Sequence, residues 1–241
     1  MKKIAIVFLL YGFLFGVLTV TTSDAGETGH YPLASKGILG SSLPLPGYYF
    51  EMFHIGYKAN EHRDKHGRRV HDDFKINSFA YAYKFIHITN KKLFGADYSW
   101  AFLVPLVYVD VQIDKLGIRD NDFGLGDIFL EPIILGWHGS RYDIAFSLSV
   151  FAPWGEYDRY QPASAGKGFW SYMFTLGGTW FFDVDKTWHL SVLTRTETHG
   201  HKRHSDIRPG NNYVTGVGSR EADLCRCRTG NFRILPVAVY R

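Results

Sequence analysis

The chain has 241 residues, of which 46% are hydrophobic and 17% aromatic, and its formal net charge is +4. This charge lies at the two ends of the chain. Residues 1–25 carry +1 and residues 219–241 carry +3, so residues 26–218 are neutral. A neutral body excludes the basic surface that nucleic-acid binding requires.

Residues 1–25 have the pattern of a secretory signal peptide. Lys2 and Lys3 form a positive start, an uncharged apolar stretch follows, and Ser23 and Ala25 supply small residues before a cleavage site after Ala25. An uncleaved membrane anchor is the alternative. We expect export, followed by a Gly-, Ser- and Pro-rich periplasmic lead-in over residues 26–47.

Period-two alternation of apolar and polar residues dominates the middle of the chain. Ile144 and Phe146 share one face of residues 141–153, whereas Asp143 and Ser147 share the other. An amphipathic helix does not have this period, so the pattern predicts β-strands. The predicted strands are residues 48–58, 74–89, 98–113, 125–138, 141–153, 168–184, 187–199 and 211–218.

The connections between these strands alternate in length. The long ones are residues 59–73, 114–124, 154–167 and 200–210. The short ones are residues 90–97, 139–140 and 185–186. Transmembrane barrels have long loops outside and short periplasmic turns, whereas a soluble sandwich has no reason to sort loop lengths by end. The sequence therefore predicts an all-β fold, an antiparallel transmembrane β-barrel of the bacterial outer membrane with at least eight strands over residues 48–218.

Residues 100–111 are apolar on both faces, with Phe102 on one face and Leu103 on the other. This pattern indicates either an apolar lumen at this strand or an inner face that the lead-in segment covers. Pro105 and Pro132 each remove a hydrogen-bond donor from the ladder and predict bulges or weakened pairing. In a transport barrel such a break can open a side exit, although a simple bend is the commoner result.

Ten polar or charged residues are expected to line the lumen. If Ile144 and Phe146 face lipid, alternation turns the residues between and beside them inward. A charged side chain that faces lipid near the midplane costs about 2–4 kcal/mol, which favours the inward position. The set is Lys84, Asp127, Glu131, Asp143, Ser147, Ser149, Thr175, Thr179, Arg195 and Glu197.

Opposite charges in this set, such as Arg195 and Glu131, can pair across the interior and determine its polarity. The alternative is that these side chains only fill and solvate a small barrel. On the outer face, aromatic residues are candidates for the girdles at the two membrane interfaces. These candidates are Trp137, Tyr142, Trp170, Trp180 and Trp188.

Two histidine-rich outer loops hold metal-ligand types of side chain. The first contains His62, His66 and His71 with Asp64, Asp72 and Asp73, and the second contains His199, His201 and His204 with Lys202 and Arg203. Basic residues crowd both loops and repel a cation. We therefore expect them to contact anionic lipopolysaccharide and predict no metal site and no cofactor.

Two further patterns do not indicate chemistry. Residues 124–127 (GLGD) lack the third glycine and the following helix of a phosphate-binding loop. Ser147, Ser149 and Ser171 lack the nucleophile elbow or the paired histidine that an esterase needs, so we predict that the chain is not an enzyme.

The last part of the chain departs from the pattern. After Gly218 the alternation stops, and Cys225 and Cys227 form a C-x-C pair without the second pair that a four-ligand metal site requires. The final residue is Arg241 rather than an aromatic. A frame change or truncation near residue 219 explains this tail, and a true atypical terminus is the alternative.

Several short motifs occur in an order that resembles a known family. They are residues 29–33 (GHYPL), 45–49 (LPGYY), 124–128 (GLGDI), 135–138 (LGWH), 152–157 (APWGEY), 169–171 (FWS) and 208–211 (RPGN). Together they resemble the outer-membrane transporter-like proteins of the meta-pathway of phenol degradation, over roughly residues 28–218. The departure is the tail, since a barrel that lacks closing strands does not conduct.

The resemblance implies an outer-membrane channel for passive uptake of hydrophobic or aromatic small molecules, with no chemical step. Its partners would be outer-membrane lipid, lipopolysaccharide and the transported molecules. A structural or adhesive surface protein whose basic loops contact lipopolysaccharide is the alternative from a different class.

Overall fold

The computed structural model describes residues 29–31, 40–63, 68–70 and 73–221. They form a nine-stranded antiparallel sheet in the order β1-β4-β5-β7-β8-β9-β10-β11, with β6 paired to β5. The strands are β1 (Gly47–Ala59), β4 (Phe74–Leu93), β5 (Ala96–Ile113), β6 (Ile118–Leu125), β7 (Ile128–His138), β8 (Tyr142–Ala152), β9 (Ser171–Phe181), β10 (Trp188–His199) and β11 (Asn212–Glu221). Among the described residues, no helix is long and apolar enough to cross a bilayer.

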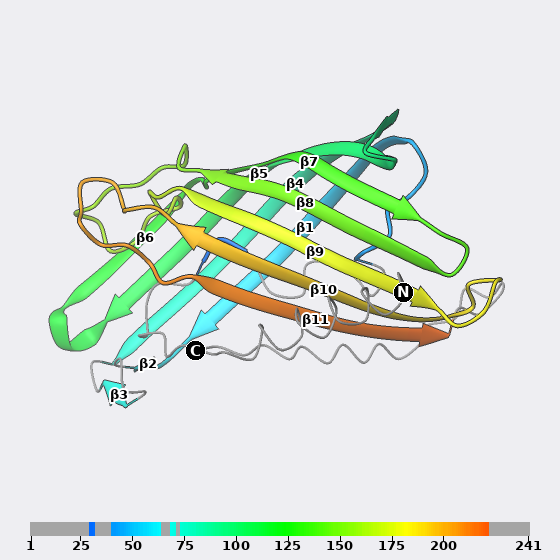
Figure 1. Ribbon diagram of the computed structural model, residues 1–241. Helices are drawn as coiled ribbons and strands as arrows, with labels where there is room; N and C mark the ends of the chain where they lie inside the picture. Colours follow the sequence, from blue (N-terminus) through cyan, green and yellow to red (C-terminus); the bar gives the residue numbers. More distant parts are fainter. Residues whose placement is uncertain (1–28, 32–39, 64–67, 71–72, 222–241) are drawn as a thin grey trace.

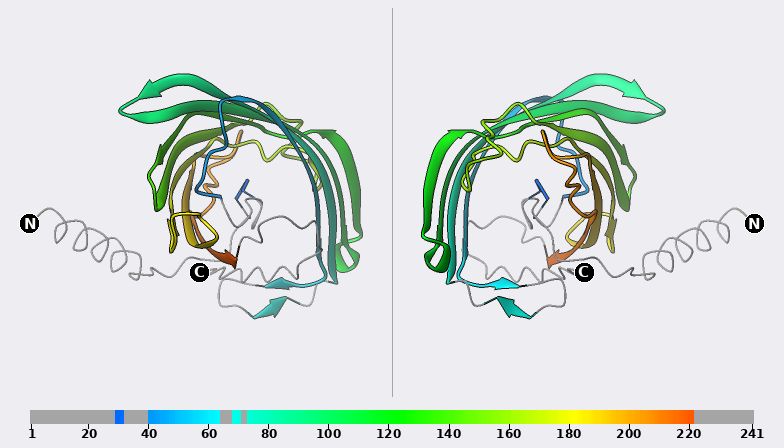
Figure 2. Two further views of the ribbon diagram at one scale, coloured as in Figure 1. Left: turned by 90° about the vertical axis from the view of Figure 1, so that its right-hand side faces the viewer. Right: turned by 90° about the vertical axis from the view of Figure 1, so that its left-hand side faces the viewer.

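The sheet curls into an open barrel (Figures 1 and 2). β1 and β11 are its two edge strands. In the end-on view, residues 29–31 of the lead-in lie inside the curve (Figure 2), whereas Leu45, just before β1, is 81% exposed. Ser41 is almost completely buried and donates a hydrogen bond to the carbonyl oxygen of Val192 in β10.

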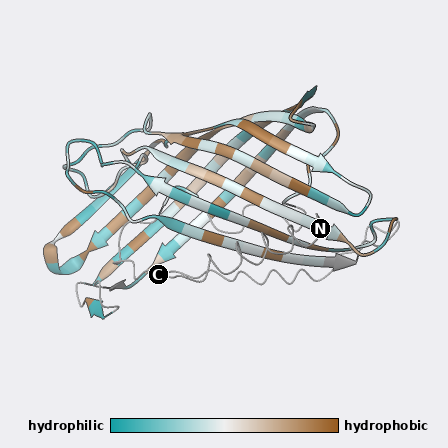
Figure 3. Cartoon of the chain, viewed as in Figure 1, coloured by the Kyte–Doolittle hydropathy of each residue, from teal (hydrophilic) through white to brown (hydrophobic). Residues whose placement is uncertain are grey.

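Apolar side chains cover the outside of the sheet, and along β8, β9 and β10 the inner side is mostly polar, which is the reverse of a soluble domain. Along β8, Ile144 and Leu148 are about 40% exposed, whereas Asp143, Ser147 and Ser149 are buried. Figure 3 shows apolar bands along the strands. The alternation that predicted the strands therefore also determines which side faces inward, and the predicted all-β antiparallel barrel fold is confirmed.

Residues 114–124 were wrongly predicted as one outer loop. A 3-10 turn, η1 (Asp114–Leu116), ends at Gly117 with a φ of 64°, and this turn reverses the chain within a few residues. Residues 118–125 then form β6 and pair with residues 106–113 of β5. A left-handed conformation favours glycine, and the expected loop therefore contracts to a hairpin turn.

Other boundaries shift by a few residues. β4 continues to Leu93 and β5 begins at Ala96, so the short turn between them is Phe94-Gly95. β11 continues to Glu221, beyond the expected end at Gly218. The long loop after β1 contains a small hairpin of β2 (His62–Arg63) and β3 (Arg69–Val70). The tail with both cysteines lies outside the described residues.

Both prolines stand where the ladder is irregular. The register between β7 and β8 shifts between Leu130 and Ile133, next to Pro132. β5 pairs with β7 only through Leu103, and beyond Pro105 it pairs with β6. The Pro105 carbonyl instead accepts the backbone N–H of Gly126 at 2.9 Å. The missing donors therefore coincide with a change of neighbouring strand.

The longest connections lie at one end of the barrel, as the sequence predicted, although the short turn between β5 and β6 also lies at that end (Figure 1). Residues 60–73, 153–170 and 200–211 join strands at one end, which we call the long-loop end. Residues 94–95, 139–141 and 182–187 join them at the other, which we call the short-turn end.

Candidate functional site

All ten residues expected to line the lumen have buried side chains on the inner side of the sheet. They fall into three groups along the barrel. Lys84, Glu131, Ser147, Ser149, Thr175 and Arg195 form a central cluster. Asp143 and Thr179 lie toward the short-turn end, and Asp127 and Glu197 toward the long-loop end.

In the central cluster, the carboxylate of Glu131 is fully engaged. Its Oε2 lies 2.8 Å from Lys84 Nζ in an ion pair. Its Oε1 accepts hydrogen bonds from the hydroxyls of Ser147 at 2.8 Å and Ser149 at 3.4 Å. The alternation that turns both serines inward therefore supplies donors to a buried anion.

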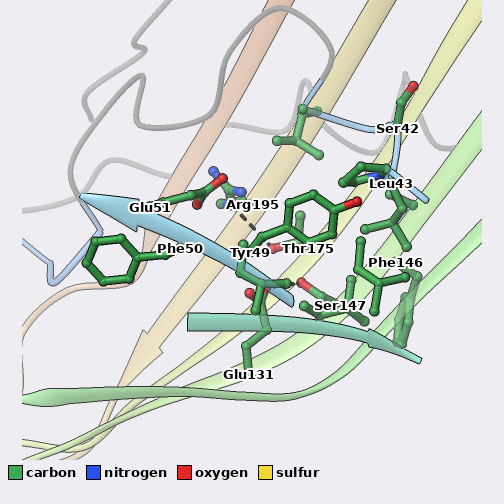
Figure 4. Close-up of a pocket in the computed structure, with 17 residues that line it drawn as sticks. Ser42, Leu43, Tyr49, Phe50, Glu51, Glu131, Phe146, Ser147, Thr175 and Arg195 are labelled. Atoms are coloured by element: carbon green, nitrogen blue, oxygen red, sulfur yellow. Dashed lines mark hydrogen bonds between the residues drawn. The ribbon is translucent and has the colours of Figure 1, made fainter. Parts of the chain in front are cut away.

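Arg195 takes different partners from those expected. Its Nε donates to Thr175 Oγ1 at 3.3 Å (Figure 4). Its Nη1 donates to the hydroxyl of Tyr31. The guanidinium also lies over the Tyr31 ring, 4.2 Å from its centre. The ion-pair partner of Glu131 is thus Lys84, and Arg195 binds the lead-in segment.

Two cavities lie inside the barrel. The larger one, about 660 Å³, lies toward the long-loop end, and the smaller one, about 330 Å³, lies beside residues 40–44 of the lead-in. Glu131 and Arg195 line both cavities. A buried carboxylate and a buried guanidinium therefore stand where the two cavities adjoin.

The larger cavity has an apolar wall. Alternate residues of β5 point into it, including Leu103, Val107, Val109 and Val111. The residues of β4 that line it include Ile76, Ala80 and Ala82, with Ser78 between them and Lys84 at the deeper end. Of the two alternatives for this strand, an apolar lumen is the one that the cavity supports.

Toward the short-turn end, Asp143 Oδ1 lies 3.1 Å from His138 Nδ1 and 3.3 Å from Lys186 Nζ. Thr179 donates to the Ser191 hydroxyl at 3.0 Å. These bonds join neighbouring strands near the turns, and this group therefore has a clear structural role.

Toward the long-loop end, four polar side chains form a continuous chain. His30 Nε2 lies 2.8 Å from Asp127 Oδ2, and His30 Nδ1 lies 2.7 Å from Ser171 Oγ. Ser171 Oγ also lies 2.7 Å from His199 Nδ1. Glu197 accepts the backbone N–H of His30 at 2.9 Å. The lead-in is thus bound to β9 and β10 across the interior.

Asp127 is the point where several of the motifs meet. Its Oδ1 accepts the N–H of Gly155 at 3.1 Å, and its Oδ2 accepts the N–H of Lys167 at 2.9 Å. A methyl group at Gly155 would lie 2.6 Å from the carbonyl carbon of Gly126, so the two glycine-containing segments touch through their backbones. A loop far along the chain therefore folds onto the start of β7.

The sequence analysis did not identify His30, and it was wrong that Ser171 lacks a histidine partner, since Ser171 Oγ lies 2.7 Å from Nδ1 of both His30 and His199. His199 was assigned to a histidine-rich outer loop, but it is the last residue of β10 and is buried, whereas His201 and His204 are exposed. Most of the first histidine cluster lies outside the described residues. The period-two alternation of β9 and β10 predicts that Ser171 and His199 point inward. No local sequence pattern shows that His30 folds back to contact them.

The girdle candidates lie at both ends of the strands. Trp137, Tyr142, Trp180 and Trp188 gather at the short-turn end, where Tyr142 pairs with Trp180 in the sheet register. Trp170 lies at the long-loop end, 6.4 Å from the Trp154 ring.

The chain matches a protein-family model and is similar in fold to solved structures. Residues 59–218 match the model of the family described as "Putative MetA-pathway of phenol degradation". The fold is similar to that in the crystal structure of an outer membrane channel from Pseudomonas putida F1, with a TM-score of 0.61 at 16% identity over 73% of this chain and 67% of that one. Among curated proteins, none matches the chain.

Proposed function

The chain belongs to the MetA-pathway of phenol degradation family, and from this premise we propose that it is an outer-membrane channel for passive uptake of hydrophobic or aromatic small molecules. The solved structure of similar fold is itself an outer membrane channel. The proposal includes export to the outer membrane and a lumen lined by the ten inward residues.

The outer surface supports insertion into a bilayer. Trp170 and Trp180 stand ten positions apart on either side of β9, which is about 33 Å along a strand. At a tilt of about 40°, this spacing corresponds to roughly 25 Å of membrane, the height of the apolar band of outer-membrane barrels. The exposed apolar side chains between them form a patch of an extent that is rare on soluble monomers. The hydrocarbon core of a bilayer is the environment that suits them.

The observation that carries the proposal is the larger cavity, with its apolar wall on β4 and β5. A volume of about 660 Å³ is in the range of small-molecule sites. The apolar wall suits an aromatic ring, while Lys84, Glu131 and Arg195 at its deeper end suit a hydroxyl group. A neutral molecule with one polar substituent fits this combination better than a fully charged one, which an apolar wall would desolvate without a partner.

The first experiment is the gel mobility of the outer-membrane fraction with and without boiling. A folded barrel resists detergent until it is heated, so a heat-dependent shift supports insertion. Absence of the shift, or of the protein from that fraction, would contradict the proposal at its first step.

Uptake is then tested with phenol in proteoliposomes. Val107 lines the larger cavity and Leu106 does not, although they are neighbours in β5. Val107→Trp should slow phenol entry several-fold by filling the cavity, whereas Leu106→Trp should leave it unchanged. Equal rates for both variants and for empty liposomes would reject a channel. Unchanged uptake in a deletion strain, together with altered binding to lipopolysaccharide, would favour the surface-protein alternative.

A further inference from the structure

Three metal-ligand types of side chain meet at the long-loop end of the interior. The atoms that His30, Glu197 and His199 offer all lie within 4.8 Å of one another. His30 Nδ1 is 3.7 Å and His199 Nδ1 is 3.9 Å from Glu197 Oε1. The three side chains are 6%, 3% and 0% exposed, so this group is not a surface cluster.

The hydrogen bonds around His30 leave one ring nitrogen free to act as a ligand. Asp127 is a carboxylate that also accepts two backbone N–H groups, so His30 Nε2 donates to it at 2.8 Å. The Nδ1 of the neutral ring then has a lone pair directed toward Ser171. A carboxylate behind the distal nitrogen is the usual arrangement for a histidine that ligates a metal.

His199 provides a second, independent indication. Its Nδ1 lies 2.7 Å from Ser171 Oγ, but its Nε2 is buried without a hydrogen-bond partner among the described residues. A buried polar atom without a partner costs about 1–3 kcal/mol. A half-turn of the ring about the Cβ–Cγ bond moves Nε2 to the position that Cε1 now takes, on the side of Nδ1 and Ser171, so Nε2 can then offer its lone pair to an ion at little cost in packing.

We propose that His30, Glu197 and His199 bind one divalent transition-metal ion of the zinc class. Two imidazoles and one carboxylate form a ligand set that Zn²⁺ accepts in tetrahedral sites. The Ser171 hydroxyl, now 2.7 Å from both His30 Nδ1 and His199 Nδ1, would give up these hydrogen bonds to the ion and lies close enough to supply the fourth ligand atom. The buried carboxylates of Glu197 and Asp127 supply two negative charges for the ion, against the nearby cations Lys167, which donates to the Gly29 carbonyl, and Arg208, which donates to the His199 carbonyl.

The ion would join two parts of the chain that are distant in sequence. His30 belongs to the lead-in segment, whereas Glu197 and His199 belong to β10. A spread of 4.8 Å is wider than the separation of ligands around zinc, whose bonds to N and O are about 2.0–2.2 Å long. Binding would therefore draw His30 toward β10 and fasten the lead-in inside the barrel.

The test uses the full chain in detergent, freed of metal with a chelator and titrated with ZnCl₂ by calorimetry and with CoCl₂ by visible absorption. Wild-type protein should bind one high-affinity ion whose Co²⁺ spectrum is that of a tetrahedral site. His199→Ala should lose this ion and spectrum. His189→Ala is the matched control, since His189 is also buried on the inner face of β10 but at the other end; it should bind as wild type.

The heat-dependent gel shift reports whether the His199→Ala variant folds. If it does not fold, a second pair of variants still tests the proposal. Asp127→Asn should weaken zinc binding about 10–100-fold, the range for residues behind a metal ligand. Asp143→Asn, another buried carboxylate of the interior, should not change it. The proposal is overturned if wild-type protein binds no ion at the site. It is equally overturned if the His199 and Asp127 variants bind as tightly as their controls.

Discussion

Lys84 Nζ and Glu131 Oε2 form an ion pair of 2.8 Å in which each side chain is 5% exposed. Lys84 is on β4 and Glu131 is on β7, and β5 lies between these strands in the sheet. The pair therefore crosses the inner face of β5, and the Lys84 ammonium also lies 5.2 Å from the centre of the Phe129 ring. It stands where the apolar wall of the larger cavity gives way to the polar residues of β8 and β9.

Removing one member of this pair should destabilise the barrel more than removing both. An unpaired buried charge costs about 3–5 kcal/mol, whereas an apolar replacement of both partners is often close to neutral. Lys84→Met should therefore lower the free energy of unfolding by several kcal/mol, and Lys84→Met with Glu131→Leu by less. Urea unfolding of the purified protein measures this. Costs that simply add in the double variant would show that the two groups act independently.

Charge at the junction of the two cavities should determine ion selectivity. Glu131 and Arg195 line both cavities, so a permeating ion passes both. In planar bilayers with a KCl gradient, Arg195→Gln should shift the reversal potential toward cation selectivity and Glu131→Gln toward anion selectivity. Arg141→Gln, at an exposed turn, should have little effect. Identical potentials in all variants would place the path elsewhere.

The contact between Gly155 and the segment at Gly126 should tolerate no side chain. A methyl group at Gly155 would lie 2.6–2.8 Å from backbone atoms of Gly126 and Asp127, which cannot rotate away. Gly155→Ala should therefore lower the temperature of the heat-dependent gel shift and loosen the loop over residues 153–170. At Gly178 the nearest atom would be 3.8 Å away, so Gly178→Ala should leave the shift temperature unchanged or raise it. If Gly155→Ala leaves the temperature of the gel shift unchanged, this close packing is contradicted.

Period two was sufficient to predict every long strand except β6 and the buried, inward side of the nine polar candidates that lie in strands, because a strand leaves each residue only two directions. The predicted loop lengths were sufficient to assign the long connections to one end of the barrel and the short turns to the other. The failure at residues 114–124 has a local cause, since Gly117 permits a tight reversal that loop composition alone does not reveal.

Partners within the interior were not predictable in the same way. Alternation gives the direction of Glu131 but not which inward cation lies opposite, because that choice depends on strand register and on the bulge next to Pro132. Nothing in the sequence places His30 beside Ser171 and His199, since the contact joins residues 141 positions or more apart. The site at the long-loop end is therefore a product of tertiary structure alone.

The turn between β9 and β10 should make stability depend on pH in acid. The Asp183 carboxylate accepts hydrogen bonds from the Thr187 hydroxyl at 2.5 Å and from the backbone N–H groups of Thr187 and Trp188 at 3.0 Å. These bonds, that from the Thr187 hydroxyl first, lower the pKa of Asp183 to about 2. A carboxyl group whose pKa is lower in the folded state stabilises the fold above its unfolded pKa of about 3.9. That contribution is lost as the pH falls from there toward 2.

The variant Asp183→Ala tests this dependence. Its stability should be below that of wild type by a constant amount from pH 7 to about pH 4, and the difference should shrink toward zero near pH 2. Asp185→Ala, an exposed position in the same turn, is the control and should follow wild type throughout. Unfolding in urea at a series of pH values measures both. A difference for Asp183→Ala that persists unchanged at pH 2 would mean that the side chain acts through packing and not through its charge, because only the ionised carboxylate accepts all of these hydrogen bonds.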